Sequence, residues 1–368
     1  MDSYTMNDTS AYTSSEGLFP ACYVEFPPSV EGRSATFFLA AEEYVASHAD
    51  FAPTAEGRPQ AYLFTWRLRP TVVMGRNQVA HQEIDLDFCR AEGIDIVRRK
   101  SGGGAIFADE RNIMTSLVTG SGAVEPLFQA YAHAVSTALN SLGATTEVSG
   151  RNDILLNYER DGETLTGKIC GNAFYHLTDH NIVHGTMLYD TDPRKMMGAL
   201  HPDQSKLRSA GVKSVRSRVA LLKDVLPFGV SELRDHLRCL LTDRCIVLSS
   251  ADVQAIEEIE REYRTPEFLY GRRAELTSVI RQRIQGVGTL ELHLALHNGK
   301  VEALQLMGDF FHSDDDAEAL FRQAFQGYAF TPTVIAERIA DVHPESAVRN
   351  LTAEALNAFL TDTDIPKE

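Results

Sequence analysis

Three cations stand directly before a triple glycine at residues 98–105, which read Arg-Arg-Lys-Ser-Gly-Gly-Gly-Ala. Glycines let backbone N–H groups approach an oxyanion closely, and arginine adds charge-assisted donors. The alternative is a plain glycine-rich turn on a solvated basic edge. The run of cations in front of the glycines favours a site for a phosphate or a carboxylate.

A second glycine-lysine segment surrounds Lys168, in Gly167-Lys-Ile-Cys-Gly171. Together with Gly162 it has the G-x-x-x-x-G-K spacing of a phosphate-binding P-loop. A P-loop would need a hydroxyl residue where Ile169 stands, and a strand leading into a helix, whereas the flanks read as two antiparallel strands. Lys168 is therefore expected either to meet a bound anion as a point charge or to be a solvated strand lysine.

Three further groups lie on strands that are expected to carry or flank Lys168. Asp153 could orient a lysine or hold magnesium, and His184 could transfer protons, although a lone histidine on a half-buried strand is more often structural. The thiol of Cys170 could have a lowered pKa and act as a nucleophile, or it could be a small core residue. No Cys-His-Asp order supports the nucleophile.

Residues 201–218 form a polar stretch rich in lysine and arginine between two predicted helices. A loop of this length inside a compact domain is typically functional. Its end, Ser-Val-Arg-Ser-Arg at 214–218, could clamp a phosphate or fold over a ligand, although read alone it is a solvated charge run.

Short strands and helices must position these groups. Runs of β-branched or aromatic residues between Gly, Pro and Asn predict the strands Cys22–Phe26, Tyr62–Trp66, Thr71–Met74, Ile94–Val97, Ile113–Val118, Asp153–Leu156, Leu165–Phe174 and Ile182–Leu188. Apolar residues at helical spacing predict the helices Ala35–Ala46, Val124–Leu142, Pro193–Leu200, Ser231–Leu241 and Val253–Tyr263.

From about residue 276 onward, a new set of predicted strands and helices forms a small α+β unit. Thr289–Leu296 and Val301–Met307 alternate around Asn298-Gly299, which predicts a hairpin with a type I′ turn, and three short helices are expected after it. The stretch 265–271 is predicted to be a hinge. We therefore expect a flexible tail at 1–19, a large domain at 20–270 and a small accessory domain at 276–368.

Composition excludes several classes of protein. The 368 residues carry 51 acidic and 35 basic side chains, a net charge of −16, and this balance argues against a nucleic-acid or anionic-membrane surface. No apolar run approaches the ~20 residues that cross a bilayer, and the N-terminus has no signal-peptide pattern. The five cysteines form no C-x-x-C pair, so we expect no disulfide framework, no structural zinc and a cytoplasmic location.

Together these segments resemble the lipoate-protein ligases of the biotin/lipoate ligase superfamily. The resemblance covers most of residues 20–270, in seven blocks that follow the family's order: 38–43 (FLAAEE), 73–78 (VMGRNQ), 98–107 (RRKSGGGAIF), 150–153 (GRND), 167–171 (GKICG), 184–186 (HGT) and 211–219 (GVKSVRSRV). The segment Gly308-Asp-Phe-Phe311 is similar to the family's small C-terminal domain. The resemblance implies an α+β fold with a large mixed-sheet catalytic domain and a small α+β accessory domain.

The resemblance also implies a two-step reaction that uses ATP, Mg²⁺ and lipoate. Lipoate would attack the α-phosphate of ATP to give lipoyl-AMP and pyrophosphate. A lysine of an acceptor protein would then take the lipoyl group. The implied acceptors are the lipoyl domains of 2-oxoacid dehydrogenase acyltransferase subunits and the glycine cleavage H protein.

Roles follow from the resemblance residue by residue. Lys168 would be the central catalytic residue, with Asp153 holding either Lys168 or magnesium. The implied ATP-binding residues are Arg99, Gly104, Ala105, Ile106, Phe107 and Lys168. The implied lipoate-binding residues are Lys168, Arg76, Ser101, Gly102, Gly103, His184 and Gly185. A loop carrying Ser205, Lys206, Lys213, Arg216 and Arg218 would cover the adenylate and exclude water.

Three positions depart from the family's pattern and leave the fine substrate preference open: Ala108, Cys170 and the pair Tyr175-His176. One rival is an octanoyl or lipoyl transferase that uses a cysteine thioester, but its nucleophile would stand at Asn181. A biotin ligase would need a different basic loop. A protein that only binds lipoate would have no need of Lys168, Arg99 and Asp153 together.

Overall fold

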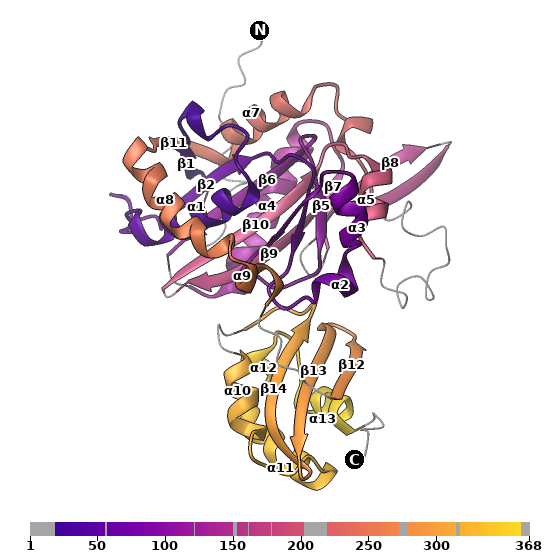
Figure 1. Ribbon diagram of the computed structural model, residues 1–368. Helices are drawn as coiled ribbons and strands as arrows, with labels where there is room; N and C mark the ends of the chain where they lie inside the picture. Colours follow the sequence, from indigo (N-terminus) through magenta and orange to yellow (C-terminus); the bar gives the residue numbers. More distant parts are fainter. Residues whose placement is uncertain are drawn as a thin grey trace.

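The structure is a computed structural model that describes residues 19–55, 57–120, 122–149, 153–160, 162–177, 179–201, 219–271, 278–313 and 317–361. Figure 1 shows a large N-terminal part with a smaller C-terminal unit beneath it. The polar stretch at 201–218 lies outside the described residues apart from His201, and the loop 205–218 that was predicted to cover the adenylate lies wholly outside them.

An eight-stranded mixed sheet forms the centre of the large N-terminal part. Its strands run in the order β11-β1-β2-β6-β10-β9-β8-β7, parallel at the β11-β1-β2 end and antiparallel beyond it. The bounds are β1 (Ala21–Glu25), β2 (Ala61–Trp66), β6 (Asn112–Thr119), β7 (Thr146–Val148), β8 (Asp153–Arg160), β9 (Glu163–Leu177), β10 (His180–Leu188) and β11 (Thr242–Val247).

Helices cover both faces of this sheet because its strands alternate between two apolar cores. On β2, Leu63 packs with α4 (Val124–Ser141) and α7 (Val230–Leu241), whereas Phe64 and Trp66 pack with α1 (Ala35–His48) and α8 (Ser250–Tyr263). All three side chains are buried. This confirms the strand predicted at residues 62–66 and the helices predicted at these four places.

A smaller sheet carries the triple glycine. Strands β4 (Asp95–Arg98), β3 (Thr71–Met74) and β5 (Ile106–Ala108) pair in that order, and the glycines connect β4 to β5. Three short helices, α2 (Ala80–Glu83), α3 (Leu86–Ala91) and α5 (Pro193–Ala199), belong to this region and contribute residues to its own small core. The glycine loop therefore starts and ends on paired strands.

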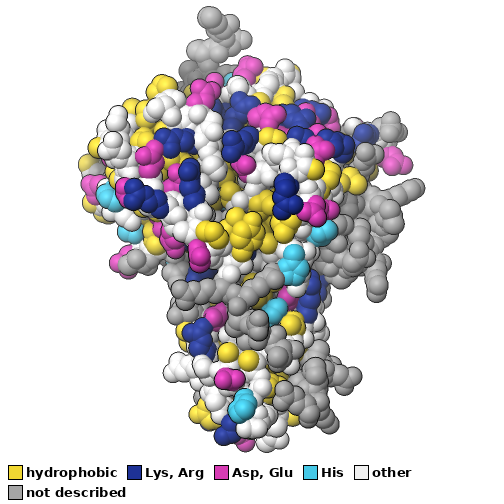
Figure 2. Space-filling view, viewed as in Figure 1, with side chains coloured by type: hydrophobic (Ala, Val, Ile, Leu, Met, Phe, Trp, Pro, Cys, Tyr) yellow, Lys and Arg dark blue, Asp and Glu magenta, His cyan; other side chains and the backbone are white. Residues whose placement is uncertain are grey.

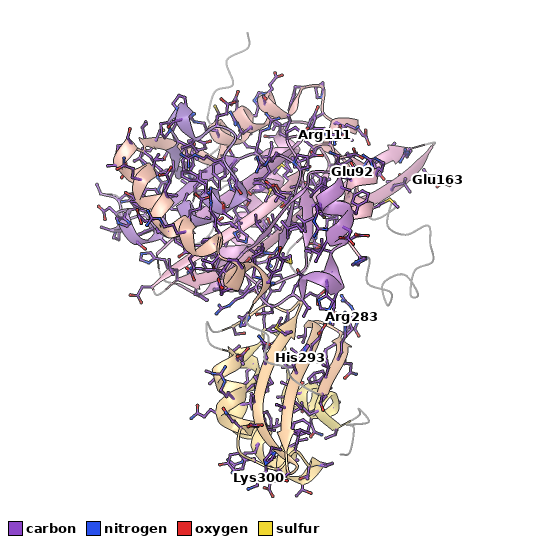
Figure 3. The ribbon with its side chains drawn as sticks, in the orientation of Figure 1. Glu92, Arg111, Glu163, Arg283, His293 and Lys300 are labelled. Atoms are coloured by element: carbon purple, nitrogen blue, oxygen red, sulfur yellow. The ribbon has the colours of Figure 1, made fainter. Side chains whose placement is uncertain are left out.

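The C-terminal unit is an antiparallel sheet of β12 (Ser278–Ile284), β13 (Gly288–His297) and β14 (Lys300–Gly308), packed against helices. Asn298 and Gly299 both have positive φ, 51° and 70°, which confirms the predicted hairpin turn. Lys300 lies at the end of this unit that is far from the N-terminal part (Figure 3). The α+β fold with a small accessory sheet is thus confirmed.

Several elements were not predicted. In the described part of the chain four helices, not three, follow the hairpin: α10 (Ala317–Phe325), α11 (Pro332–Val342), α12 (Pro344–Ala347) and α13 (Ala353–Thr361). Strands β11 and β12 were missed because most of their side chains are exposed and many are charged, so neither shows an apolar alternation. Strand β5 has only three residues. The expected hinge at 265–271 contains a short helix, α9 (Pro266–Tyr270), whose Leu269 carbonyl accepts a hydrogen bond from Arg98.

Charged side chains of both signs are mixed on the face shown in Figure 2. Two of the ion pairs in the described residues are Arg194 with Glu92, at 2.7 Å, and Arg111 with Asp109, at 2.5 Å. Within the described residues, no helix combines the length and apolar character that crossing a membrane requires.

Candidate active site

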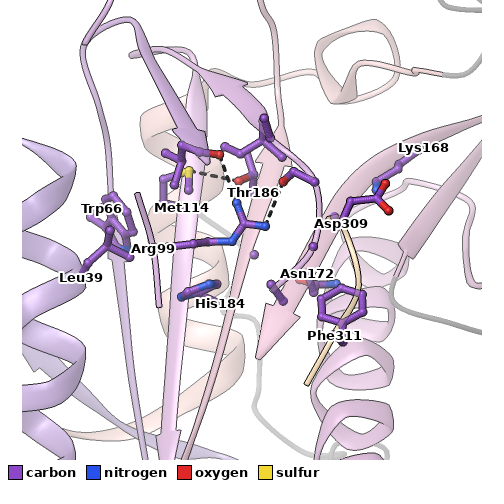
Figure 4. Close-up of a pocket in the computed structure, with 18 residues that line it drawn as sticks. Leu39, Trp66, Arg99, Met114, Lys168, Asn172, His184, Thr186, Asp309 and Phe311 are labelled. Atoms are coloured by element: carbon purple, nitrogen blue, oxygen red, sulfur yellow. Dashed lines mark hydrogen bonds between the residues drawn. The ribbon is translucent and has the colours of Figure 1, made fainter. Parts of the chain in front are cut away.

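A cavity of about 250 Å³ lies between the two sheets, on the α1 side of the large one. Strands β2, β3, β6, β9 and β10 and the glycine loop all contribute to its lining, and the C-terminal unit adds Asp309 and Phe311. Figure 4 shows Leu39 and Trp66 at one end, and Lys168, Asp309 and Phe311 at the other. The cavity therefore has an apolar end and a polar end.

Lys168 stands at the polar end because of a bulge in β9. Ile154 pairs with Cys170 and Leu155 pairs with Lys168, so Ile169 is an extra residue between them. A bulge places two successive side chains on the same face of a sheet, and here Ile169 and Cys170 both enter the α4 core while Lys168 faces the cavity. Without the extra residue, Lys168 and Cys170 would share a face.

The ammonium of Lys168 pairs with Asp153 across the β8–β9 pair. The Nζ–Oδ1 distance is 2.6 Å, and the two side chains are 39% and 29% exposed. Gly171 leaves the space that Lys168 occupies, since a Cβ there would lie 2.7 Å from Nζ. Asp153 and Gly171 thus hold the lysine over the strand, with its charge facing the cavity.

Cys170 points away from the cavity. It is 1% exposed, its Sγ donates to the Asn172 side-chain oxygen at 3.3 Å, and burial raises its pKa to about 12. A thiol in this state stays protonated and inaccessible. Of the two alternatives left open by the sequence, the small core residue is the one observed.

Arg99 lies inside the glycine loop. Its guanidinium donates four hydrogen bonds, to Ser101 Oγ and to the carbonyl oxygens of Val73, Gly102 and Gly104. Burial lowers its pKa to about 10, and the charge of Glu42 opposes that shift. Arg99 reaches the cavity, but most of its donors hold the loop in shape.

The other two cations of the run are also engaged within the protein. Arg98 donates to the carbonyl oxygens of Gly75, Arg76, Gln78 and Leu269, and burial lowers its pKa to about 10. Lys100 is paired with Glu43 and Glu262. The expectation that this run supplies charge directly to an anion therefore fits Arg99 alone.

The structure gathers most of the predicted ligand-binding residues at this one cavity, whose lining includes Arg99, Gly103, Gly104, Ala105, Ile106, Lys168, His184 and Gly185. Four predicted residues do not line it. The Ser101 side chain is fully buried on the side of the loop away from the cavity, and Phe107 enters the core of the small sheet. Arg76 is exposed, and together with Gly102 it borders a separate small cavity. These four can act on a ligand here only through their neighbours.

Gly102 makes room for the C-terminal unit. A Cβ there would lie 2.3 Å from the carbonyl oxygen of Phe310. The next residue, Gly103, donates its N–H to that same oxygen at 3.1 Å, and Gly308 donates to the carbonyl of Asn77 at 2.8 Å. The Phe311 ring stacks on Phe174 with 5.7 Å between centroids. Part of the glycine loop therefore serves an interdomain contact.

The sequence reasoning missed several cavity residues, namely Leu39, Trp66, Val73, Met114, Asn172, Ala173, Thr186, Asp309 and Phe311. Most are apolar strand or helix residues, and no local pattern separates a residue that lines a cavity from one that fills a core. Asp309 and Phe311 were noted only as part of a family segment. Glu42 was missed too; it is a fully buried carboxylate within 3.0 Å of His184 Nδ1.

Among the described residues, no group of three His, Cys, Asp or Glu side chains could hold a metal ion. The expected magnesium ligand, Asp153, has its Oδ1 against Lys168. This pairing fits the alternative in which Asp153 orients the lysine. The expected covering residues Ser205, Lys206, Lys213, Arg216 and Arg218 all lie outside the described residues.

Two families match the chain. The lipoyl protein ligase A/B catalytic domain matches residues 34–241, and the bacterial lipoate protein ligase C-terminus matches residues 274–360. Lipoate-protein ligase LplJ of Bacillus subtilis (strain 168) is 32% identical over 327 residues, which span 86% of this chain and 93% of that protein.

Solved structures agree with these matches. A bi-partite lipoate protein ligase, described with its E2 lipoyl domain, from Thermoplasma acidophilum is 25% identical, with a TM-score of 0.58 over 70% of this chain and 99% of that one. The lipoate complex of LipL1 from P. falciparum shares the fold, with a TM-score of 0.71, 18% identity and 93% and 99% coverage. With a catalytic-domain match over more than half its length, this chain belongs to the lipoate-protein ligase family and is a ligase.

Proposed function

We propose that the protein activates lipoate with ATP and transfers the lipoyl group to a lysine of an acceptor protein. In the first step, a carboxylate oxygen of lipoate bonds to the α-phosphorus of ATP, and pyrophosphate leaves. In the second, the acceptor amine attacks the acyl carbon, the bond to AMP breaks, and the nitrogen loses a proton. The observation that carries this proposal is Lys168, held by Asp153 at the polar end of a cavity with an apolar opposite end.

Lys168 suits the first step because negative charge concentrates where the carboxylate meets the α-phosphate. An ammonium fixed beforehand stabilises that charge without having to reorganise. Asp153 accepts a hydrogen bond from one N–H group of the Lys168 ammonium, and the other two N–H groups are left for the substrates.

The glycine loop suits the triphosphate. The N–H groups of Gly104 and Ala105 make no hydrogen bond to any other described residue, and both residues line the cavity. A Cβ at Gly104 would meet nothing within 4 Å, so the loop is open on this side. Free backbone donors beside Arg99 are a typical phosphate site. Magnesium would enter with ATP and be held mainly by the phosphates.

The apolar end suits the lipoyl chain. Leu39, Trp66 and Met114 can bury a hydrocarbon chain and a disulfide ring, and Lys168 lies at the opposite end, where the carboxylate would be. The expected acceptors are lipoyl domains of 2-oxoacid dehydrogenases and the glycine cleavage H protein. The association of the Thermoplasma ligase with an E2 lipoyl domain supports the first of these.

A transferase that uses a cysteine thioester is disfavoured. Cys170, the candidate nucleophile near Lys168, faces the α4 core and has a raised pKa. No acyl group in the cavity could reach it without unfolding the strand.

Lipoate-dependent exchange of labelled pyrophosphate into ATP tests the proposal. Lys168→Ala should lower the exchange rate by about 10²–10³-fold, which is typical for the loss of one preorganised charge donor. Lys223→Ala is a matched control, because Lys223 is 40% exposed and pairs with Asp190 at 2.7 Å away from the cavity. This control should keep the wild-type rate.

Exchange that needs no lipoate, or that survives Lys168→Ala, would contradict the proposal. Acyl transfer from an octanoyl carrier protein, with no exchange in any variant, would replace it with the transferase mechanism.

A further inference from the structure

A chain of buried hydrogen bonds connects the apolar end of the cavity to the glycine loop. It passes through Trp66, Ser116, Glu42, His184, Ser101 and Arg99. Each of these side chains is at most 7% exposed, and Glu42 is fully buried. The chain begins at the apolar end, where Trp66 lines the cavity, and finishes in the glycine loop at Arg99.

Chemistry sets the direction of every bond in this chain. Indole and guanidinium nitrogens only donate, so Trp66 donates to Ser116 at 3.0 Å and Arg99 donates to Ser101 at 2.9 Å. Each serine hydroxyl is then free to pass on its own hydrogen. Ser116 donates to the Glu42 carboxylate at 2.6 Å.

His184 completes the other branch. Its Nδ1 lies 3.0 Å from both oxygens of Glu42 and therefore donates, while Nε2 lies 2.7 Å from Ser101 Oγ. A neutral imidazole with its proton on Nδ1 satisfies all of these groups, because Nε2 accepts the Ser101 hydrogen. With the proton on Nε2, Ser101 Oγ would accept from both His184 and Arg99, and the Ser101 hydrogen would lose Nε2 as its acceptor.

The Trp66–Ser116 branch and the Arg99–Ser101–His184 branch therefore both end at the Glu42 carboxylate. We propose that Glu42 is a positioning residue with two branches. Through Ser116 it sets the orientation of Trp66 at the apolar end of the cavity. Through His184, Ser101 and Arg99 it sets the orientation of the glycine loop. Glu42 does not itself line the cavity, so it acts through the lining residues that this chain of hydrogen bonds reaches. Its buried negative charge also offsets the buried charge of Arg99.

Glu42→Gln is the discriminating variant because it keeps the size of the side chain and reverses part of its hydrogen bonding. The amide has one oxygen in place of two, and its NH₂ group would stand where the second carboxylate oxygen lies, 3.0 Å from His184 Nδ1. We expect His184 to relieve this donor–donor contact by moving its proton to Nε2, so that Ser101 accepts from both His184 and Arg99. Glu260→Gln is the matched control. Glu260 is 3% exposed and bonds to Thr36 at 2.5 Å and to Arg264, in the α1–α8 contact.

Two spectroscopic signals report on this chain of hydrogen bonds in the ligand-free protein. Trp66 is the one tryptophan of the chain, so its indole N–H gives a single resonance. In Glu42→Gln we expect this resonance to shift and the ¹⁵N signals of His184 to change from the Nδ1–H to the Nε2–H tautomer. In Glu260→Gln both signals should match wild type, even where the loss of stability is similar.

The functional half of the test rests on the proposed ligase reaction. Glu42→Gln should weaken lipoate binding, followed by Trp66 fluorescence, and lower pyrophosphate exchange, each by roughly 10- to 100-fold. Glu42→Asp, which restores an acceptor, should recover part of both. If wild type fails to bind lipoate, the proposed function fails while the spectroscopic result stands. Unchanged Trp66 and His184 signals in Glu42→Gln, or equal losses of binding in Glu260→Gln, would overturn the positioning role.

Discussion

Lys168 and Cys170 are two residues apart and yet have opposite environments. The extra residue in β9, Ile169, turns the lysine toward the cavity and the thiol toward the α4 core. There the thiol loses its solvation, which is the main cause of its raised pKa. The charge of Lys168, which favours the thiolate, is the smaller influence. A cysteine beside a lysine is therefore no nucleophile when a bulge separates their faces.

Alkylation tests this assignment at the residue scale. A thiol with a pKa of about 12 remains almost wholly protonated as the pH rises from 7 to 9, so iodoacetamide should leave Cys170 unmodified across that range. Exposed Cys239 should react and serves as the internal control. Cys170→Ala should keep lipoate-dependent exchange and lose about 1 kcal/mol of stability through lost packing. Rapid labelling of Cys170 in the folded protein would contradict the buried thiol.

Among the structural elements, the glycine loop has two faces: one contacts the C-terminal unit and the other lines the cavity. Gly102 and Gly103 meet Phe310 of the C-terminal unit, whereas Gly104 opens on the cavity. Arg99 ties the carbonyl oxygens of Gly102 and Gly104 together from within. Because a single arginine holds both sides, a shift of the loop at the domain contact would be transmitted to the amides that face the cavity.

Two alanine substitutions separate these sides. Gly102→Ala places a methyl group 2.3 Å from the Phe310 oxygen and should cost about 1–3 kcal/mol in unfolding free energy, as overpacking does. Gly104→Ala meets no neighbour within 4 Å and should leave stability close to wild type while weakening ATP binding. Denaturant unfolding and ATP titration of both variants measure the difference. Equal losses of stability would show that the loop is not divided in this way.

In the whole molecule, the N-terminal part and the C-terminal unit touch at a second place besides the glycine loop. Arg349 pairs with Glu125 of α4, and its guanidinium lies 5.3 Å from the Phe174 ring centroid and 6.0 Å from that of Phe128. Burial lowers the pKa of Arg349. The C-terminal unit is thus held both at the glycine loop and on α4.

Arg349→Met should loosen this contact by about 1 kcal/mol, since it removes a partly exposed ion pair and two cation–ring contacts. The amides of Gly103 and Gly308 donate across the contact, so their hydrogen exchange should accelerate by about fivefold. Arg322→Met, which removes an ion pair with Glu318 inside α10, should leave both rates unchanged. Unchanged protection of these two amides in Arg349→Met would mean that the other contacts hold the C-terminal unit without Arg349.

The sequence by itself determined the family, the main strands and helices, the hairpin at Asn298-Gly299 and the presence of Lys168 near a glycine loop. These features are local, because turn residues, alternation and short motifs act within a few positions of the chain. Only the tertiary structure decided which groups meet. Residue spacing cannot reveal the bulge that separates Lys168 from Cys170, and Glu42 and His184 lie 142 residues apart in the chain. The same holds for Asp309 and Phe311, which reach the cavity because a separate unit packs there.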